Sequence, residues 1–205
     1  MNPTLRAAID NARAENMPVD NIDRAIKKGT GESKEAAQID EVVYEGYGPG
    51  GVALYIETLT DNRNRTIANL KTIIGKKGGN MGAAGSVGYL FQRKGLVNVL
   101  AGEKSSEEIE LAAIDAGAQD IIVGEEIIEI YTDPQALMQV KKALESSGIK
   151  VDSARLTYMA QNAIAVNETE TARKLIDLIE AIEDDEDVTE VYSNDEIAPE
   201  VLEKL

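Results

Sequence analysis

The 205-residue sequence predicts an α+β protein in which a helical N-terminal segment precedes two mixed α/β domains, the second inserted in the first. Three observations favour this class. Apolar residues recur with helical spacing up to Gly29, and runs with a period of two begin at Val42. Strand-like and helix-like segments then alternate regularly from Leu96 to Ala160. A hydrophobic content of 43% over this length also favours more than one core.

The N-terminal segment predicts two short helices. Asn2 and Pro3 suit the cap and the first turn of one helix, whose apolar face holds Leu5, Ile9 and Ala12. Pro18 interrupts the pattern. The second helix is expected to run from near Asp20 to Gly29, and its apolar face consists of Ile22, Ala25 and Ile26.

These two helices are too short to enclose a core by themselves. They must either pack on the rest of the chain or contact a segment that precedes Met1. Residues 30–38, TGESKEAAQ, are expected to form a linker to the next domain.

A discontinuous domain is predicted after the linker. It begins with a β-hairpin over Val42–Leu59 that turns at Gly48–Gly51, followed by a helix capped by Asp61 or Asn62. Ser86–Gln92 is expected to form its next strand, which gives the order ββαβ. The inward face of this helix is expected to hold Ile67, Leu70 and Ile74. Its outward face is expected to hold Arg65, Asn69, Thr72 and Lys76.

An inserted domain follows with the order βαββαβ, a split βαβ or ferredoxin-like arrangement. Ser105 and Glu108 form a capping box for its first helix, which Gly117 ends, and Asp133 is expected to cap the second, which ends at Gly148. Its four strands are predicted over 96–100, 119–124, 127–132 and 149–160.

A helix from Thr169 to about Asp184 and a strand over Glu190–Ser193 would complete the discontinuous domain. The helix is expected to point Ala172, Leu175, Ile179 and Ile182 inward. The predicted boundaries are therefore 1–35 for the helical domain, 39–93 plus 163–205 for the discontinuous domain, and 94–162 for the inserted domain.

The composition argues against most enzymatic chemistry. The chain has neither histidine nor cysteine, so it lacks the usual general base, the usual metal ligand and every Ser-His or Cys-His nucleophile. Glycine-rich segments near Gly46 and Gly75 lack the spacing or the strand-to-helix context of nucleotide-binding loops. The acidic run Glu183–Asp187 is interpreted as a solvated helix end, with a divalent-cation site as the alternative.

No signal-peptide core and no run near the ~18 apolar residues of a spanning helix are present, which favours a soluble, cytoplasmic protein without a membrane partner. The aromatic residues Tyr44, Tyr47, Tyr55, Tyr89 and Phe91 fall on predicted strands, where packing is the expected role and base stacking the alternative.

A basic segment is the strongest indication of function. Between Asn62 and Gly102 the chain carries seven basic residues and no acid, although its formal net charge is −16. Because self-repulsion favours mixing of the two signs, this segment indicates a surface that meets a polyanion. A basic helix face that serves only solubility is the alternative.

Three strings carry a resemblance to a known family: MPVDNIDRAIKKGTG, YEGYGPGGVALYIETLTDNRNRT and KKGGNMGAAGSVGYLFQRKG. In this order and over nearly the whole chain, they resemble the YebC/PmpR family of probable transcriptional regulators and translational activators. The resemblance implies a helical domain and two ferredoxin-like α/β domains, no catalytic activity and no cofactor. Family members usually begin with a strongly basic stretch, a candidate for nucleic-acid contact, and this sequence starts after it.

The expected function is therefore non-enzymatic regulation of gene expression through nucleic acid, either as a DNA-binding transcriptional regulator or as a ribosome-associated translational activator that binds RNA. A contrasting hypothesis is a regulatory module whose inserted domain binds a metabolite or a protein. Metal ligands and catalytic residues are not expected. The expected nucleic-acid contacts are phosphate-binding side chains of Arg63, Arg65, Lys71, Lys76, Lys77, Arg93 and Lys94, and backbone amides near Gly78, Gly79, Gly82 and Gly85.

Overall fold

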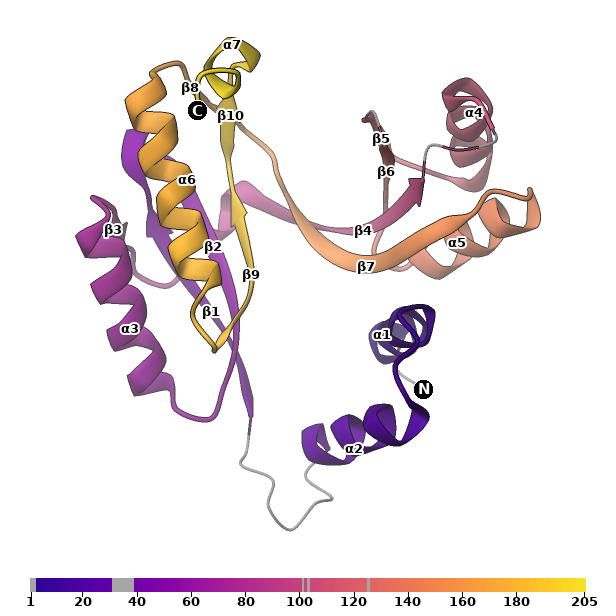
Figure 1. Cartoon of the computed structure of the whole chain (residues 1–205), viewed down its shortest axis with the longest axis horizontal. Coiled ribbons are helices and arrows are strands. Elements are labelled where there is room, and N and C mark those ends of the chain that lie inside the picture. The colour runs from indigo at the N-terminus through magenta and orange to yellow at the C-terminus, as the bar shows by residue number, and fades with distance from the viewer. Residues whose placement is uncertain (1–2, 31–38, 101, 103, 125) are drawn as a thin grey trace. The chain divides into compact units, whose positions relative to one another are not determined.

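The structure is a computed structural model that describes residues 3–30, 39–100, 102, 104–124 and 126–205 (Figure 1). The predicted cap at Asn2 and most of the predicted linker lie outside the described residues. The chain divides into two compact units. The first unit comprises residues 1–27 and 93–158, and the second comprises residues 28–92 and 159–205.

The first unit contains an antiparallel sheet and two helices. Its elements after the N-terminal helices are β4 (Phe91–Leu100), α4 (Ser106–Ala116), β5 (Asp120–Val123), β6 (Ile127–Thr132), α5 (Leu137–Ser146) and β7 (Val151–Ala160). The strand order is β5-β6-β4-β7, which is compatible with the ferredoxin-like arrangement. Apolar residues of α4, α5 and the sheet form its core, including Val97, Ile109, Ile130 and Leu144.

The capping pattern explains where α4 begins and ends. Ser105 Oγ accepts a hydrogen bond from the Glu108 amide, and the Glu108 carboxylate accepts one from the Ser105 amide. Gly117 ends the helix with a φ of 100°, in the left-handed region that glycine tolerates. Both features confirm the sequence prediction.

The N-terminal helices α1 (Pro3–Ala14) and α2 (Val19–Gly29) are present as predicted. Ile9 and Ile22 are buried, whereas Ala25 is exposed. Asn11 Nδ2 donates a hydrogen bond to the Ala154 carbonyl, 3.3 Å away on β7. The first helix therefore contacts the sheet of the first unit.

The second unit is built on a four-stranded sheet with the order β3-β1-β2-β9. Its main elements are β1 (Asp40–Tyr47), the 3-10 turn η1 (Pro49–Gly51), β2 (Ala53–Thr60), α3 (Arg63–Lys76), β3 (Asn80–Met81), η2 (Gly88–Leu90), α6 (Thr169–Glu183) and β9 (Val188–Ser193). A parallel pair, β8 (Ile164–Val166) and β10 (Asp195–Ile197), and the short α7 (Pro199–Leu202) complete it. The predicted hairpin is confirmed, with a register from Asp40↔Thr60 to Tyr47↔Ala53.

The two faces of this sheet have different roles. Helices α3 and α6 lie together over one face (Figure 1), where Tyr44, Leu54 and Ile56 pack against Leu70 and Leu175. Because side chains alternate along a strand, Glu45 and Tyr47 of β1 point to the opposite face. We call this opposite face the open face.

Two predicted boundaries are wrong. Ser86–Gln92 is not one strand: η2 occupies Gly88–Leu90, and only Phe91 and Gln92 belong to β4, which continues to Leu100. The amides of Val87 and Gly88 bond to the Glu45 side chain instead of a neighbouring strand. Similarly, α5 begins at Leu137, because the Asp133 carboxylate accepts a hydrogen bond from the Gln135 amide in a turn before the helix.

In the part of the chain that the structure describes, no helix combines the length and the apolar character that crossing a bilayer requires.

Candidate nucleic-acid interface

Arg63 and Arg65 lie in the first turn of α3, where both guanidinium groups have acidic partners. Asn62 caps the helix by accepting a hydrogen bond from the Arg65 amide. Arg63 Nε lies 2.9 Å from Asp40 Oδ2, and Arg65 Nη2 lies 2.7 Å from Asp187 Oδ1. Arg65 also lies near two other carboxylates, at 3.2 Å from Asp61 and 3.8 Å from Glu186. These acids lie outside the acid-free segment in sequence and adjoin it in space.

Asp187 is the anchor of this end of the helix. Only 4% of its surface is exposed, and Thr66 Oγ1 donates a 2.8 Å hydrogen bond to its other carboxylate oxygen. Burial by itself would raise the pKa of Asp187, but the hydrogen bonds from Arg65 and Thr66 outweigh burial and hold the pKa below its usual value. Asp187 therefore joins the α6–β9 connection to the start of α3.

The interpretation of Glu183–Asp187 as a simple solvated helix end is thus corrected at Asp187. A second acid of the run is also engaged, because Asn69 Nδ2 donates a 3.1 Å hydrogen bond to Asp185. Among the described residues, no group of three or more acidic side chains is arranged to hold a metal ion.

The second half of α3 together with its C-cap, which we call the unpaired end of the helix, carries lysines without acidic partners. Lys71, Lys76 and Lys77 are exposed, and none forms an ion pair with any residue that the structure describes. The helix has 14 residues, so its two ends are separated by about 20 Å at 1.5 Å per residue. The structure therefore divides the predicted basic surface along one helix into a paired end and an unpaired end.

The glycine amides that were expected to face phosphate are occupied within the chain, which corrects that part of the prediction. Gly78 and Gly79 donate to carbonyls of α3, and Gly82 donates to the Glu45 carbonyl. Gly85 donates to the Glu45 carboxylate at 2.7 Å. Glycine is nevertheless needed here: a Cβ on Gly79 would lie 2.6 Å from the Tyr47 carbonyl oxygen, and Gly85 has a φ of 84°.

Glu45, on the open face of β1, holds the glycine-rich loop that connects β3 to β4. Its carboxylate accepts hydrogen bonds from the Gly85 amide and, at 2.6 and 2.9 Å, from the amides of Val87 and Gly88. Burial opposes ionisation of Glu45, but the three amides together lower its pKa below the usual value. We call this arrangement the Glu45 clamp.

Sequence reasoning missed the Glu45 clamp. The available indication was an acid on the predicted strand immediately before a long acid-free, glycine-rich segment. Successive backbone N–H groups in a glycine-rich turn need an anionic partner, and a carboxylate on the neighbouring strand can provide it.

Arg93 and Lys94 belong to β4 in the first unit, whereas the other five basic site residues belong to the second unit. Arg93 is exposed. Lys94 Nζ donates a 2.6 Å hydrogen bond to Gln119 Oε1, so its ammonium has a neutral local partner.

The aromatic residues separate into a packed group and two residues that remain open to solvent. Tyr44 and Phe91 are buried, and the rings of Tyr55 and Phe91 lie 5.5 Å apart, which confirms packing as their role. Tyr47 is 36% exposed and Tyr89 is 72% exposed. Base stacking therefore stays a prediction for Tyr47 and Tyr89.

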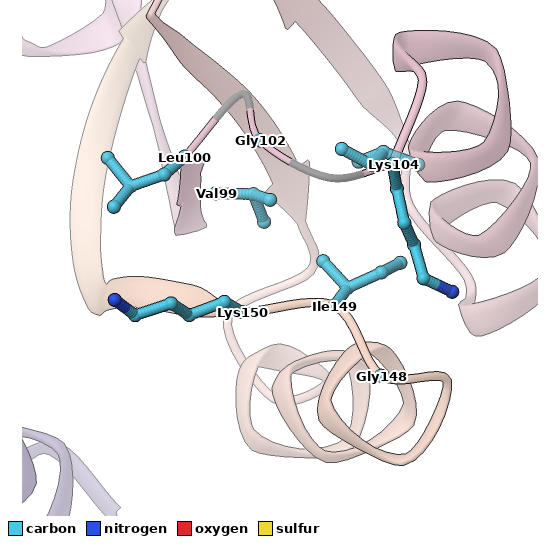
Figure 2. Close-up of a pocket in the computed structure, with 8 residues that line it drawn as sticks. Val99, Leu100, Gly102, Lys104, Gly148, Ile149 and Lys150 are labelled. Carbon is cyan, nitrogen blue, oxygen red and sulfur yellow. The ribbon is translucent and has the colours of Figure 1, made fainter.

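A pocket in the first unit is relevant to the small-molecule hypothesis. It has a volume of about 410 Å³ and lies between the end of β4 and the turn before β7. Figure 2 shows Lys104 and Lys150 extending on opposite sides of Val99 and Ile149. Lys104 Nζ donates a 2.6 Å hydrogen bond to the Ser147 carbonyl, whereas Lys150 is exposed.

Comparisons with known proteins agree along the whole chain. Residues 39–195 match the family model described as TACO1/YebC second and third domain, and residues 1–32 match the TACO1/YebC protein N-terminal domain. A probable transcriptional regulatory protein from Halothermothrix orenii is 46% identical, over all of this chain and 81% of that protein. One from Aquifex aeolicus is 48% identical, over all of this chain and 82% of that protein.

A crystal structure of a conserved hypothetical protein from Aquifex aeolicus is similar to the whole fold. Its TM-score is 0.91 at 48% sequence identity, and the match covers 98% of this chain and 82% of that chain.

Proposed function

The chain belongs to the TACO1/YebC family, and we propose that it regulates gene expression by binding nucleic acid without catalysing a reaction. The observation that carries this proposal is the unpaired end of α3. Lys71, Lys76 and Lys77 remain without acidic partners in a chain whose formal net charge is −16. The cationic site attracts a polyanion, whereas the acidic remainder of the molecule repels it.

The three lysines would contact phosphates and release the counterions that surround them, which makes the affinity fall with salt. Arg63 and Arg65 would stay in their ion pairs to Asp40 and Asp187, because binding to phosphate would compete with those pairs, and we expect no measurable phosphate contact from either arginine. Arg93 and Lys94 would form a separate basic site on the first unit. Phosphate contacts of this kind position a protein without reading the sequence.

Relatives carry the name probable transcriptional regulatory protein, which favours DNA as the target and transcription as the regulated step. RNA of the ribosome, with translation as the regulated step, is the alternative. Either target would place the protein in the cytoplasm, with no membrane partner. The absence of histidine and cysteine and the internal pairing of Asp187 support a role without catalysis.

The test is the binding of purified protein to labelled duplex DNA, single-stranded DNA and RNA, measured by fluorescence anisotropy over a range of salt concentrations. We expect the logarithm of affinity to fall with the logarithm of salt at a slope of about −2 to −3, as for roughly three phosphate contacts. The preferred nucleic acid distinguishes transcription from translation. Failure to bind any of the three at low salt would contradict the proposal.

A second candidate function rests on the pocket of the first unit. Its apolar residues and Lys150 would suit a small organic anion with an apolar body. A ligand of this kind would raise the melting temperature with increasing concentration, and Lys150→Ala would remove the effect. A screen of small carboxylates and phosphates that leaves the melting temperature unchanged would exclude this candidate.

A further inference from the structure

Tyr89 is the most exposed large hydrophobic side chain among the residues that the structure describes, at 72%. Exposed single apolar residues are common on proteins and usually need no explanation. Tyr89 differs because the backbone around it is tightly held. An aromatic side chain that is both exposed and rigidly presented has the properties of a binding residue.

Hydrogen bonds fix the loop on both sides of Tyr89. Before it, the Val87 and Gly88 amides donate to the Glu45 carboxylate. After it, the Leu90 amide donates to the Val87 carbonyl, and the Leu90 carbonyl accepts from the Gln161 amide, both at 2.8 Å. Binding to Tyr89 would therefore cost little backbone ordering.

Contacts within the second unit connect this loop to the unpaired lysines. Lys76 and Lys77 are followed by β3, where Asn80 pairs with Tyr47 of β1. The Tyr47 hydroxyl in turn donates a 3.1 Å hydrogen bond to the Ser86 carbonyl in the loop. The pairing and the hydrogen bond thus connect the end of α3, through the edge strand β3, to Tyr47 and the Tyr89 loop, and we call this connected region the edge of the second unit.

The carboxylate of Glu45, which binds this loop, is already engaged by the loop's own amides. Glu45 is 9% exposed and accepts three amide hydrogen bonds, so its charge is directed into the loop and away from a ligand. Residues 62–102 themselves contain no acid. A nucleic acid could therefore approach the edge without meeting an exposed carboxylate from this segment.

We propose that this edge binds an unpaired stretch of nucleic acid, with a base stacked on the Tyr89 ring and the adjoining phosphates on Lys76 and Lys77. The inference rests on the proposed function and adds its substrate class. An unpaired base can turn its face toward a side chain, whereas a base inside a duplex is covered by its neighbours. Duplex DNA would use the lysines alone.

The experiment compares wild type, Tyr89→Ala, Tyr89→Phe and Leu111→Ala. Leu111 is 65% exposed in the first unit and provides a matched control for removal of an exposed apolar side chain. Affinities are measured for labelled oligothymidylate, oligouridylate and a duplex of equal length. Tyrosine fluorescence gives a second readout, because the chain has seven tyrosines and no tryptophan.

We expect Tyr89→Ala to weaken single-strand binding about tenfold or more, Tyr89→Phe to stay within about twofold of wild type, and duplex binding to change little in either variant. Oligothymidylate should quench part of the wild-type fluorescence, and Tyr89→Ala should remove part of that quenching. Equal single-strand affinities of wild type and Tyr89→Ala would overturn the inference while the proposed function stands. A partner protein would then be the better explanation of Tyr89. If wild type binds none of the probes, the proposed function itself fails.

Discussion

The two ends of α3 carry similar numbers of basic residues but differ in what surrounds them. At the start of the helix, Arg63 and Arg65 lie within 4 Å of acids from β1 and from the α6–β9 connection. At its end, Lys71, Lys76 and Lys77 have no acidic partner among the described residues. A segment without acids in the sequence can therefore still be neutralised in space, and charge that is free to bind must be located in the fold.

Arg65→Ala offers the strongest way to test the paired end. It would leave the buried Asp187 carboxylate without its cationic partner, with threonine hydroxyls as its remaining donors, and we expect the free energy of unfolding to fall clearly more than in the control below. Arg63→Ala is the matched control: its ion pair with Asp40 is solvent-exposed, so we expect a loss of less than about 1 kcal/mol. Urea titration followed by circular dichroism measures both. Equal losses would show that Asp187 is not the anchor.

Removal of the Glu45 carboxylate should have a smaller effect, confined to the glycine-rich loop. Glu45→Ala would leave the amides of Gly85, Val87 and Gly88 without their acceptor, at a cost of about 1–3 kcal/mol. Amide hydrogen exchange should accelerate at these three residues first. Glu41→Ala, an exposed acid on the same strand, should leave their exchange unchanged. Unaltered protection in Glu45→Ala would refute the Glu45 clamp.

Low pH should weaken both the Asp187 contacts and the Glu45 clamp, because protonation of each carboxylate is linked to unfolding. Because the pKa values of Asp187 and Glu45 are lowered in the folded state, their stabilisation is present above the unfolded-state values of about 4 and is lost as the pH falls through the lower folded-state values. We expect Glu45→Gln to flatten the decrease in stability between about pH 5 and pH 2. A variant that loses stability with acid as steeply as wild type would show that the clamp does not titrate in this way.

Much of the fold was predictable because local patterns determine it. The capping box at Ser105, the left-handed Gly117 and the β1–β2 hairpin all depend on residues close together in the sequence. The segment Ser86–Gln92 was misassigned because the amides of Val87 and Gly88 bond to Glu45, about 40 residues earlier. Strand alternation cannot reveal an acceptor of that kind.

The candidate site was predictable only in part for the same reason. The basic segment of the sequence pointed to α3. The acidic partners of Arg65, however, are Asp61, Glu186 and Asp187, and two of these lie more than 100 residues away in the sequence. The exposure of Tyr89 likewise follows from η2, since in a regular strand Tyr89 would share a face with Val87 and Phe91, which are both buried. Ion pairs and hydrogen bonds between residues far apart in the sequence decide which predicted site residues remain without an acidic partner. No sequence periodicity reveals such contacts.

The central claim is that the unpaired end of α3 binds phosphate and the paired end does not. The most direct measurement is the salt dependence of nucleic-acid affinity for wild type, Lys76→Ala, Arg63→Ala and the triple variant Lys71→Ala/Lys76→Ala/Lys77→Ala. Each single variant removes one positive charge from the same helix. We predict that Lys76→Ala lowers the magnitude of the log–log slope by about 1, that the triple variant removes most of it, and that Arg63→Ala leaves it unchanged. A slope that falls equally in Arg63→Ala, or a folded triple variant with wild-type affinity, would contradict the claim.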